Sequence, residues 1–196
     1  YFSFFEFSAE PIGRRIFLSL FQSVTPRTAG FNTADLTALS ETGQTLTIGL
    51  MLIGGSPGST AGGMKTTTAA VLVACAVAVF RRRENGRFFG RRIADDTVKN
   101  AITVFLMYIS LFLLGGMIIS RVEGLPILTC LFETASAIGT VGLTLGITPG
   151  LHLISKLILI SLMFLGRIGG LTLIFATLSA NKNTLSKLPL EKITVG

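Results

Sequence analysis

The chain carries the same short pattern twice, and this repetition constrains its fold more than any other feature. An apolar stretch leads into a loop of small residues around Gly30 and again around Gly142, 112 residues further on. Gly54 and Gly166, which each close an apolar run, are also 112 residues apart. A repeat of this length indicates a duplicated structural unit. In a membrane protein, such a duplication favours a pathway formed between the repeats.

The composition indicates that this unit lies in a membrane. Only 14% of the residues are charged, whereas a soluble domain carries about 25%. Uncharged stretches run over 42–64, 66–80, 101–120 and 157–166. A helix needs roughly 20 apolar residues to cross a bilayer, and residues 101–120 meet that length alone. We therefore predict an all-α, polytopic membrane protein.

The net charge of +7 is concentrated in two segments. Six arginines crowd one short loop and three lysines mark the tail: Arg81, Arg82, Arg83, Arg87, Arg91 and Arg92, then Lys182, Lys187 and Lys192. Basic clusters can bind nucleic acid, but beside apolar spans they are better explained as cytoplasmic anchors under the positive-inside rule. We expect membrane lipid, and no nucleic acid, next to these residues.

Two predicted helices, at 16–24 and 127–138, are too short to cross the bilayer, and a glycine loop follows each. The chain must therefore enter the membrane and return on the same side. Irregular backbone at membrane depth is tolerated where it lines a water-filled cavity, so we interpret both loops as pore linings. The expected parts are a repeat with a truncated first span over 1–82, a basic cytoplasmic loop over 83–96, a second repeat over 97–180 and a cytoplasmic tail over 181–196.

The two loops have the residues that a carbonyl-lined ion site needs. A dehydrated alkali cation requires oxygen ligands in place of water, and Thr140-Val141-Gly142 is the first part of the string that supplies them in potassium channels. The short helices would also direct their partly negative C-terminal ends at the site, which favours a cation. Because the loops differ, each would supply one quarter of a pseudo-symmetric ring, and two further loops must lie upstream or on another chain. The candidate ion-binding residues are Thr28, Ala29, Gly30, Phe31, Thr140, Val141, Gly142 and Leu143.

A third glycine-rich segment interrupts the apolar run after residue 53. It nearly fits the phosphate-loop pattern G-x-x-x-x-G-K-[ST], but Met64 breaks the spacing and an apolar helix, rather than a strand, is expected before it. A plain helix kink is a second alternative. We favour an intramembrane loop of small residues that lies under the ion site and acts as a gate. Its residues are Gly54, Gly55, Ser56, Pro57, Gly58, Ser59, Thr60, Ala61, Gly62, Gly63 and Lys65.

Two charged residues fall inside apolar segments. Arg167 lies in the last predicted span and corresponds to Gly55 in the first copy. Charge at membrane depth is expensive and usually functional, and a guanidinium has five donors that could bond the loop's carbonyls, so we assign Arg167 to the gate; a snorkelling arginine is the alternative. Glu133 precedes the second loop, where it could attract cations or cap the short helix, and the sequence does not separate these roles.

Residues 24–32, 54–65, 136–144 and 162–169 resemble the Ktr/Trk/HKT potassium transporter superfamily, most closely its KtrB-type membrane subunit. The resemblance implies a polypeptide of four M1–P–M2 repeats with re-entrant pore loops, of which this chain would hold the third and fourth. It assigns the filter glycines to Gly30 and Gly142, the gating loop to 54–66 and the arginine of the fourth M2 helix to Arg167.

The resemblance also implies a function and partners. It implies potassium uptake, in some members sodium-dependent, by a multi-pass protein of the plasma membrane that forms a homodimer. A cytosolic nucleotide-binding RCK ring of the KtrA type would open the gate, and neither enzymatic activity nor a cofactor is expected. The rivals are an ordinary tetrameric cation channel subunit, which would have one pore loop per chain, and a membrane-bound nucleotide-binding protein that uses residues 58–66.

Overall fold

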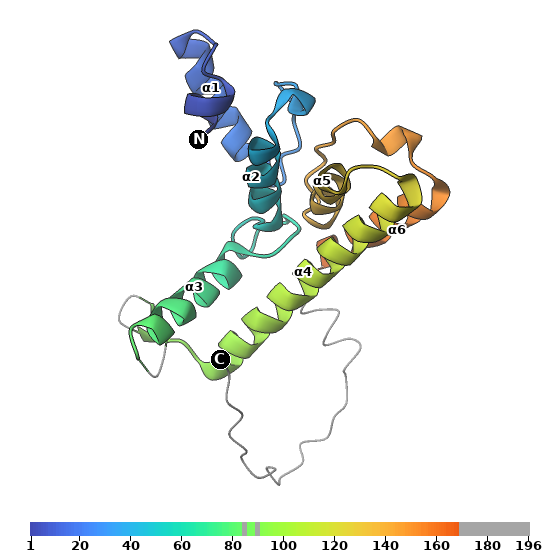
Figure 1. Ribbon diagram of the computed structural model, residues 1–196. Coiled ribbons are helices and arrows are strands. Elements are labelled where there is room, and N and C mark those ends of the chain that lie inside the picture. The colour runs from blue at the N-terminus through green and yellow to red at the C-terminus, as the bar shows by residue number, and fades with distance from the viewer. Residues whose placement is uncertain (84–85, 89–90, 169–196) are drawn as a thin grey trace.

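The computed structural model describes residues 1–83, 86–88 and 91–168 (Figure 1). Its elements are η1 (Phe2–Glu6), α1 (Ile12–Val24), η2 (Leu36–Ala38), α2 (Glu41–Leu52), α3 (Thr66–Phe80), β1 (Arg87–Phe88), β2 (Arg91–Arg92), α4 (Asp95–Glu123), α5 (Ile127–Ile138), η3 (Thr148–Gly150) and α6 (Leu153–Ile168). The structure is thus helical apart from one small antiparallel hairpin, β1–β2, in which Arg87 faces Arg92.

Helix α4 is the longest element and, among the described residues, the one helix that is long and apolar enough to cross a membrane. Its 29 residues extend about 44 Å at 1.5 Å per residue. Asp95 and Asp96 occupy the first turn, where the helix dipole favours negative charge. Gly124, with a left-handed φ of 69°, ends the helix. The shorter apolar helices are α3 and α5.

Helix α5 is the centre of the packed core and contacts α2, α4 and α6. Its residues from Phe132 to Ile138 are all buried. Close approach of α4 is possible because that helix has Gly116 at the contact, where an added Cβ would lie 2.5 Å from a Cδ atom of Leu131. Small residues at helix interfaces allow the close van der Waals packing that drives helix association in membranes. The short helix is therefore held rigidly by three neighbours.

Helix α1 has a different environment, because it lies apart from the core and packs mainly against η1. Several large apolar side chains on it are exposed: Ile12, Ile16, Phe17, Leu20 and Val24. No described residue covers this apolar face. The first copy of the repeat is therefore less completely packed in this chain than the second.

The helix bounds agree closely with the periodicity of the sequence. Helix α5 has the predicted bounds, and α3 coincides with the uncharged stretch at 66–80. Helix α1 begins four residues before the predicted helix at 16–24, and α4 extends beyond the uncharged stretch at 101–120 at both ends. The hairpin β1–β2 was not expected; it lies in the basic loop at 83–96. The end of the last predicted span, beyond residue 168, and the tail at 181–196 lie outside the described residues.

Candidate functional site

The two repeated glycines face each other directly. An added Cβ on Gly30 would lie 2.2 Å from the carbonyl oxygen of Val141, and one on Gly142 would lie 3.9 Å from the Cα of Gly30. Neither position can therefore gain a side chain without moving main-chain atoms of the facing loop or, at Gly142, without backbone strain at its φ of 93°. The structure brings the two loops into contact although they are 112 residues apart.

The two loops share an unusual backbone conformation. Thr28 and Thr140, which are equivalent in the repeat, have positive φ angles of 65° and 50°. Gly30 and Gly142, two residues further on, have φ angles of 72° and 93°. Left-handed conformations at residues other than glycine cost free energy and persist where the surrounding structure enforces them, as at binding sites. Both loops therefore place left-handed residues at alternate positions.

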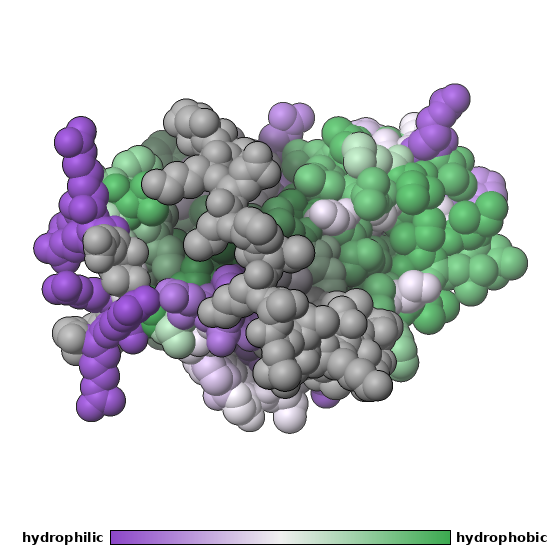
Figure 2. All heavy atoms as spheres, turned by 90° about the horizontal axis from the view of Figure 1, so that it is seen from below, coloured by the Kyte–Doolittle hydropathy of each residue, from purple (hydrophilic) through white to green (hydrophobic). Residues whose placement is uncertain are grey.

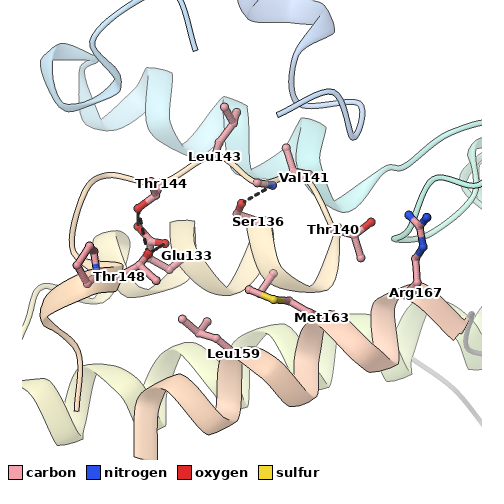
Figure 3. Close-up of a pocket in the computed structure, with 13 residues that line it drawn as sticks. Glu133, Ser136, Thr140, Val141, Leu143, Thr144, Thr148, Leu159, Met163 and Arg167 are labelled. Atoms are coloured by element: carbon pink, nitrogen blue, oxygen red, sulfur yellow. Dashed lines mark hydrogen bonds between the residues drawn. The ribbon is translucent and has the colours of Figure 1, made fainter. Parts of the chain in front are cut away.

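Each loop is tied to the end of the short helix that precedes it. In the second loop, the Oγ of Ser136 accepts a hydrogen bond from the main-chain N–H of Gly142 at 3.2 Å (Figure 3). In the first loop, the hydroxyl of Thr25 donates to the carbonyl of Phe31 at 2.5 Å. Each loop is thus fixed by a hydroxyl residue at the end of its own helix. Ser136 acts as the acceptor and Thr25 as the donor.

Glu133 braces the chain where it leaves the second loop. Its Oε1 accepts hydrogen bonds from the hydroxyl of Thr144 at 2.6 Å and from the main-chain N–H of Leu145 at 2.9 Å. Its Oε2 accepts from the hydroxyl of Thr148 at 2.8 Å, and Figure 3 shows the carboxylate between the two threonines. The residue is buried and lies in the middle of α5. The carboxylate is therefore a support for the return segment and not a cap of the helix.

The third loop, residues 54–65, is closed at its base by main-chain hydrogen bonds. The N–H of Gly54 donates to the carbonyl of Met64 at 2.7 Å, and the N–H of Met64 donates to Leu52 at 3.2 Å. The N–H of Thr66, at the start of α3, donates to Gly55 at 3.2 Å. The glycine at 54 is required because an added Cβ would lie 2.1 Å from the carbonyl oxygen of Gly62.

Two basic side chains hold this loop and the helix before it. The ammonium of Lys65 donates to the carbonyls of Ser59 at 3.0 Å and Ala61 at 2.7 Å. The guanidinium of Arg27, from the first loop, donates to the carbonyl of Ile53 at 2.7 Å, where α2 has just ended. Arg27 thereby bonds a main-chain oxygen at the end of α2, where helix carbonyls lack intrahelical partners, and Lys65 bonds two carbonyls within the loop.

The second loop contacts both the third loop and the first. The N–H of Gly62 donates to Thr140 Oγ1 at 3.1 Å, and an added Cβ on Gly63 would lie 3.4 Å from the Cα of Gly139. The hydroxyl of Thr28 donates to the carbonyl of Gly139 at 3.4 Å. All three glycine-rich segments singled out in the sequence therefore meet at one place.

Arg167 lies beside this cluster, and its side chain is exposed. It lines a pocket of about 580 Å³ together with Thr140, Val141, Gly142 and Glu133. Figure 3 shows its side chain extending from α6 on the side of Thr140. The expected hydrogen bond from Arg167 to the third loop is not among those that the described residues form. Lys65 bonds the loop's carbonyls instead.

The surroundings of residues 58–66 differ from those of a phosphate loop. Helix α2 precedes the loop, where a phosphate loop requires a strand. The ammonium of Lys65, which would contact a nucleotide phosphate, bonds two carbonyls of its own loop. These contacts give no support to the nucleotide-binding alternative.

Sequence reasoning missed three residues of the site: Thr25, Arg27 and Ser136. Each lies within or immediately before a loop that the repeat pattern had identified. A hydroxyl residue in the last turn of a short helix was the available signal for Thr25 and Ser136. No local pattern indicated the contact between Arg27 and α2.

Comparisons with known proteins agree with this geometry. The chain is 44% identical to the potassium/sodium uptake protein NtpJ of Enterococcus hirae, over 93% of this chain and 42% of that protein. It is 41% identical to the Ktr system potassium uptake protein B of Bacillus subtilis, over 83% of this chain and 36% of that protein. It spans about two fifths of the length of these curated relatives.

The fold has a counterpart among solved structures. The crystal structure of the potassium transporter TrkH from Vibrio parahaemolyticus matches 87% of this chain and 38% of its own, with a TM-score of 0.72 and 25% sequence identity. This likeness confirms the predicted class of an all-α membrane protein with re-entrant pore loops. Residues 6–185 match the TrkH family, which is described as a cation transport protein, and the resemblance to the Ktr/Trk superfamily and its KtrB-type subunit is thereby confirmed. The chain belongs to the TrkH family of membrane cation transport proteins.

Proposed function

We propose that this chain supplies two of the four repeats of a potassium-uptake pathway. Residues 28–31 and 140–143 would form half of an ion-selective ring of main-chain carbonyls. The contact between Gly30 and Gly142 is the observation that carries the proposal, because a shared ring requires the two loops to meet. The names of the relatives, a potassium/sodium uptake protein and a potassium uptake protein, support potassium as the ion and leave sodium as a second or coupled ion.

The chemistry of the loops suits this role. Carbonyl oxygens can replace the hydration shell of potassium when the backbone comes close to the pore axis, which the glycines permit. Helices α1 and α5 end just before the loops, so their partly negative ends face the same place and favour a cation. The firm attachment of both loops to the helix ends would keep the oxygens in position without induced movement.

We propose that residues 54–66 form the gate. This segment touches Thr140 of the filter, so it stands directly at the end of the proposed ring. Its hydrogen bonds to Thr140 and from Lys65 would hold it closed; a neutral bond contributes about 1 kcal/mol and a bond from a charged group about 1.5–3 kcal/mol. A small number of bonds at this level allows a regulator to release the loop. Arg167, exposed beside Thr140, would add an electrostatic barrier to cations.

The remaining organisation is part of the same proposal. Repeats three and four would occupy 1–82 and 97–180, joined by a cytoplasmic loop at 83–96 and followed by a cytoplasmic tail at 181–196. The uncovered apolar face of α1 supports the packing of upstream repeats against it. The protein would be a multi-pass, non-enzymatic homodimer of the plasma membrane, without a cofactor, opened by a cytosolic nucleotide-binding RCK ring of the KtrA type.

A matched pair of glycine substitutions in the complete four-repeat polypeptide tests this function. Gly30→Ala places a methyl group against Val141, whereas Gly124→Ala places one in open space at the end of α4. The φ angles of the two positions, 72° and 69°, are nearly equal, so both variants bear the same backbone strain of about 1–2 kcal/mol. We expect Gly30→Ala to lose more than nine tenths of potassium uptake per folded protein in potassium-uptake-deficient cells, and Gly124→Ala to retain it. Equal uptake by both variants would contradict the proposal.

A tetrameric channel subunit is the second candidate. It would carry one pore loop per chain and form the ring from identical copies. The presence of two unlike loops in mutual contact within one chain favours the transporter. Uptake by a polypeptide that contains only residues 1–196 would support the channel instead.

A further inference from the structure

The connection between α3 and α4 concentrates positive charge at one end of the molecule. The exposed basic side chains of this connection are Arg81, Arg82, Arg83, Arg87, Arg91 and Arg92. Figure 2 shows hydrophilic side chains gathered at the corresponding edge, next to a largely hydrophobic face. Of the six, Arg92 forms an ion pair with Asp95 at 3.2 Å; the other five form none with a residue that the structure describes.

A pocket of about 280 Å³ opens at this place, between the C-terminal end of α3 and the N-terminal end of α4. Arg83 and Lys99 contribute the positive charge of the pocket, and Gly86, from the connection between them, also lines it. Asp95 is the one acidic residue among those that line the pocket, and its carboxylate is already bonded by Arg92. Neither Arg83 nor Lys99 has an acidic partner among the described residues. We call this site the α3–α4 pocket.

The wall of the α3–α4 pocket that α3 forms is apolar. Cys75, Ala78 and Val79 of α3 line it. Val79 and Phe80 are 73% and 87% exposed at the end of the helix. Two cations without an acidic partner among the described residues, next to an exposed apolar surface, match the two parts of a phospholipid, an anionic headgroup and an acyl chain. A free phosphate ion would use the cations but gain nothing from the apolar wall.

We propose that the α3–α4 pocket binds the phosphate headgroup of an anionic phospholipid, with the acyl chain lying along the exposed side of α3. The guanidinium of Arg83 and the ammonium of Lys99 would bond the phosphate oxygens. Basic pockets between membrane helices on the cytoplasmic side are suited to such headgroups. The proposal goes beyond ion permeation and requires only that this end of the chain faces the cytoplasmic leaflet.

Lipid titration of the complete transporter in detergent tests this site. Binding of phosphatidylglycerol and of phosphatidylcholine is measured by native mass spectrometry for the wild type, for the double variant Arg83→Gln with Lys99→Gln, and for the charge-preserving variant Arg83→Lys. Arg121→Gln is the matched control, because Arg121 is an exposed arginine at the opposite end of α4. A parallel titration includes inorganic phosphate as a competitor.

We expect phosphatidylglycerol affinity to fall about fivefold for each basic residue removed, which corresponds to about 1 kcal/mol per residue. Arg83→Lys and Arg121→Gln should bind as the wild type does, and phosphatidylcholine binding should not change in any variant. Equal loss in Arg121→Gln, or undiminished binding in the double variant, would overturn the proposal. Displacement by inorganic phosphate at the same concentration as the lipid would also overturn it, because the apolar wall would then contribute nothing to binding.

Discussion

The main-chain N–H of Gly62 donates a hydrogen bond to the hydroxyl oxygen of Thr140, across 3.1 Å and 78 positions of the sequence. Gly62 belongs to the loop that interrupts the helical run between α2 and α3, and Thr140 belongs to the proposed ion ring. An added Cβ on Gly62 would lie 2.2 Å from the same oxygen. The proposed gate and the proposed filter are therefore in direct contact, and neither can shift without affecting the other.

This contact predicts the effect of Gly62→Ala. The methyl group cannot fit against Thr140, so the loop must move away from the ring, and we expect potassium flux in the absence of the regulator to rise at least several-fold. Gly49→Ala, in α2, is the control, because nothing lies within 4 Å of its added atom and its backbone, like that of Gly62, is not left-handed. Ion flux into proteoliposomes measures the effect. Unchanged or lower flux in well-folded Gly62→Ala would count against a gate at this position.

The hydrogen bonds of Lys65 predict a second way to free the loop, which is to remove their donor. Lys65→Met removes the donor from the carbonyls of Ser59 and Ala61, and hydrogen bonds from a charged group contribute about 1.5–3 kcal/mol each. We expect the loop to become mobile on the nanosecond scale, as measured by the line shape of a spin label at position 60, and unregulated flux to increase. Lys65→Arg, which can still donate, should remain close to the wild type. A label that stays equally immobile in Lys65→Met would show that Lys65 does not hold the loop in place.

The exposed position of Arg167 predicts that its substitution changes cation flux through charge and leaves the packing intact. Its side chain is exposed beside Thr140, so Arg167→Ala should raise cation flux with little change in thermal stability. Arg121→Ala, at the far end of α4, removes the same charge away from the pathway and should leave flux as it is. Equal flux in wild type and Arg167→Ala would remove the barrier role assigned to this residue.

The hydrogen bonds of Glu133 predict that its replacement lowers both thermal stability and ion selectivity. Glu133→Ala removes the acceptor of the hydroxyls of Thr144 and Thr148 and of the N–H of Leu145. Thr144 is exposed, but Leu145 and Thr148 are half-buried, and a buried group left unsatisfied costs about 1–3 kcal/mol. We expect a lower melting temperature and a reduced potassium-to-sodium uptake ratio. Glu41→Ala removes an exposed carboxylate from the first turn of α2 and serves as the control. A Glu133→Ala protein with the wild-type melting temperature would contradict the bracing role.

Much of the second repeat could be predicted from the sequence, because its signals are local. The bounds of α5 follow from an apolar run between Pro126 and Gly139. In the first repeat, α3 follows in the same way from an uncharged stretch that ends at the arginines. The meeting of Gly30 and Gly142 followed from the repeat, since equivalent positions around a shared axis must approach one another.

The missed features include contacts between distant segments and one local hairpin. The bond from Arg27 to Ile53 joins the first loop to α2, and no periodicity encodes it. Lys65, which the sequence assigned to the gate, lies in a near-match to a phosphate loop and bonds two carbonyls of its own segment. The hairpin β1–β2 arises in a charged segment with too few apolar residues to give a strand pattern.

The most direct test of the central claim is the position of the permeating ion. Crystals of the complete protein grown or soaked with rubidium, which replaces potassium and scatters anomalously, would locate it. We predict an anomalous peak coordinated by main-chain carbonyls of residues 28–30 and 140–142, on an axis that Gly30 and Gly142 share. A structure in which these two glycines lie apart or face lipid, or a peak held by other residues, would contradict the account.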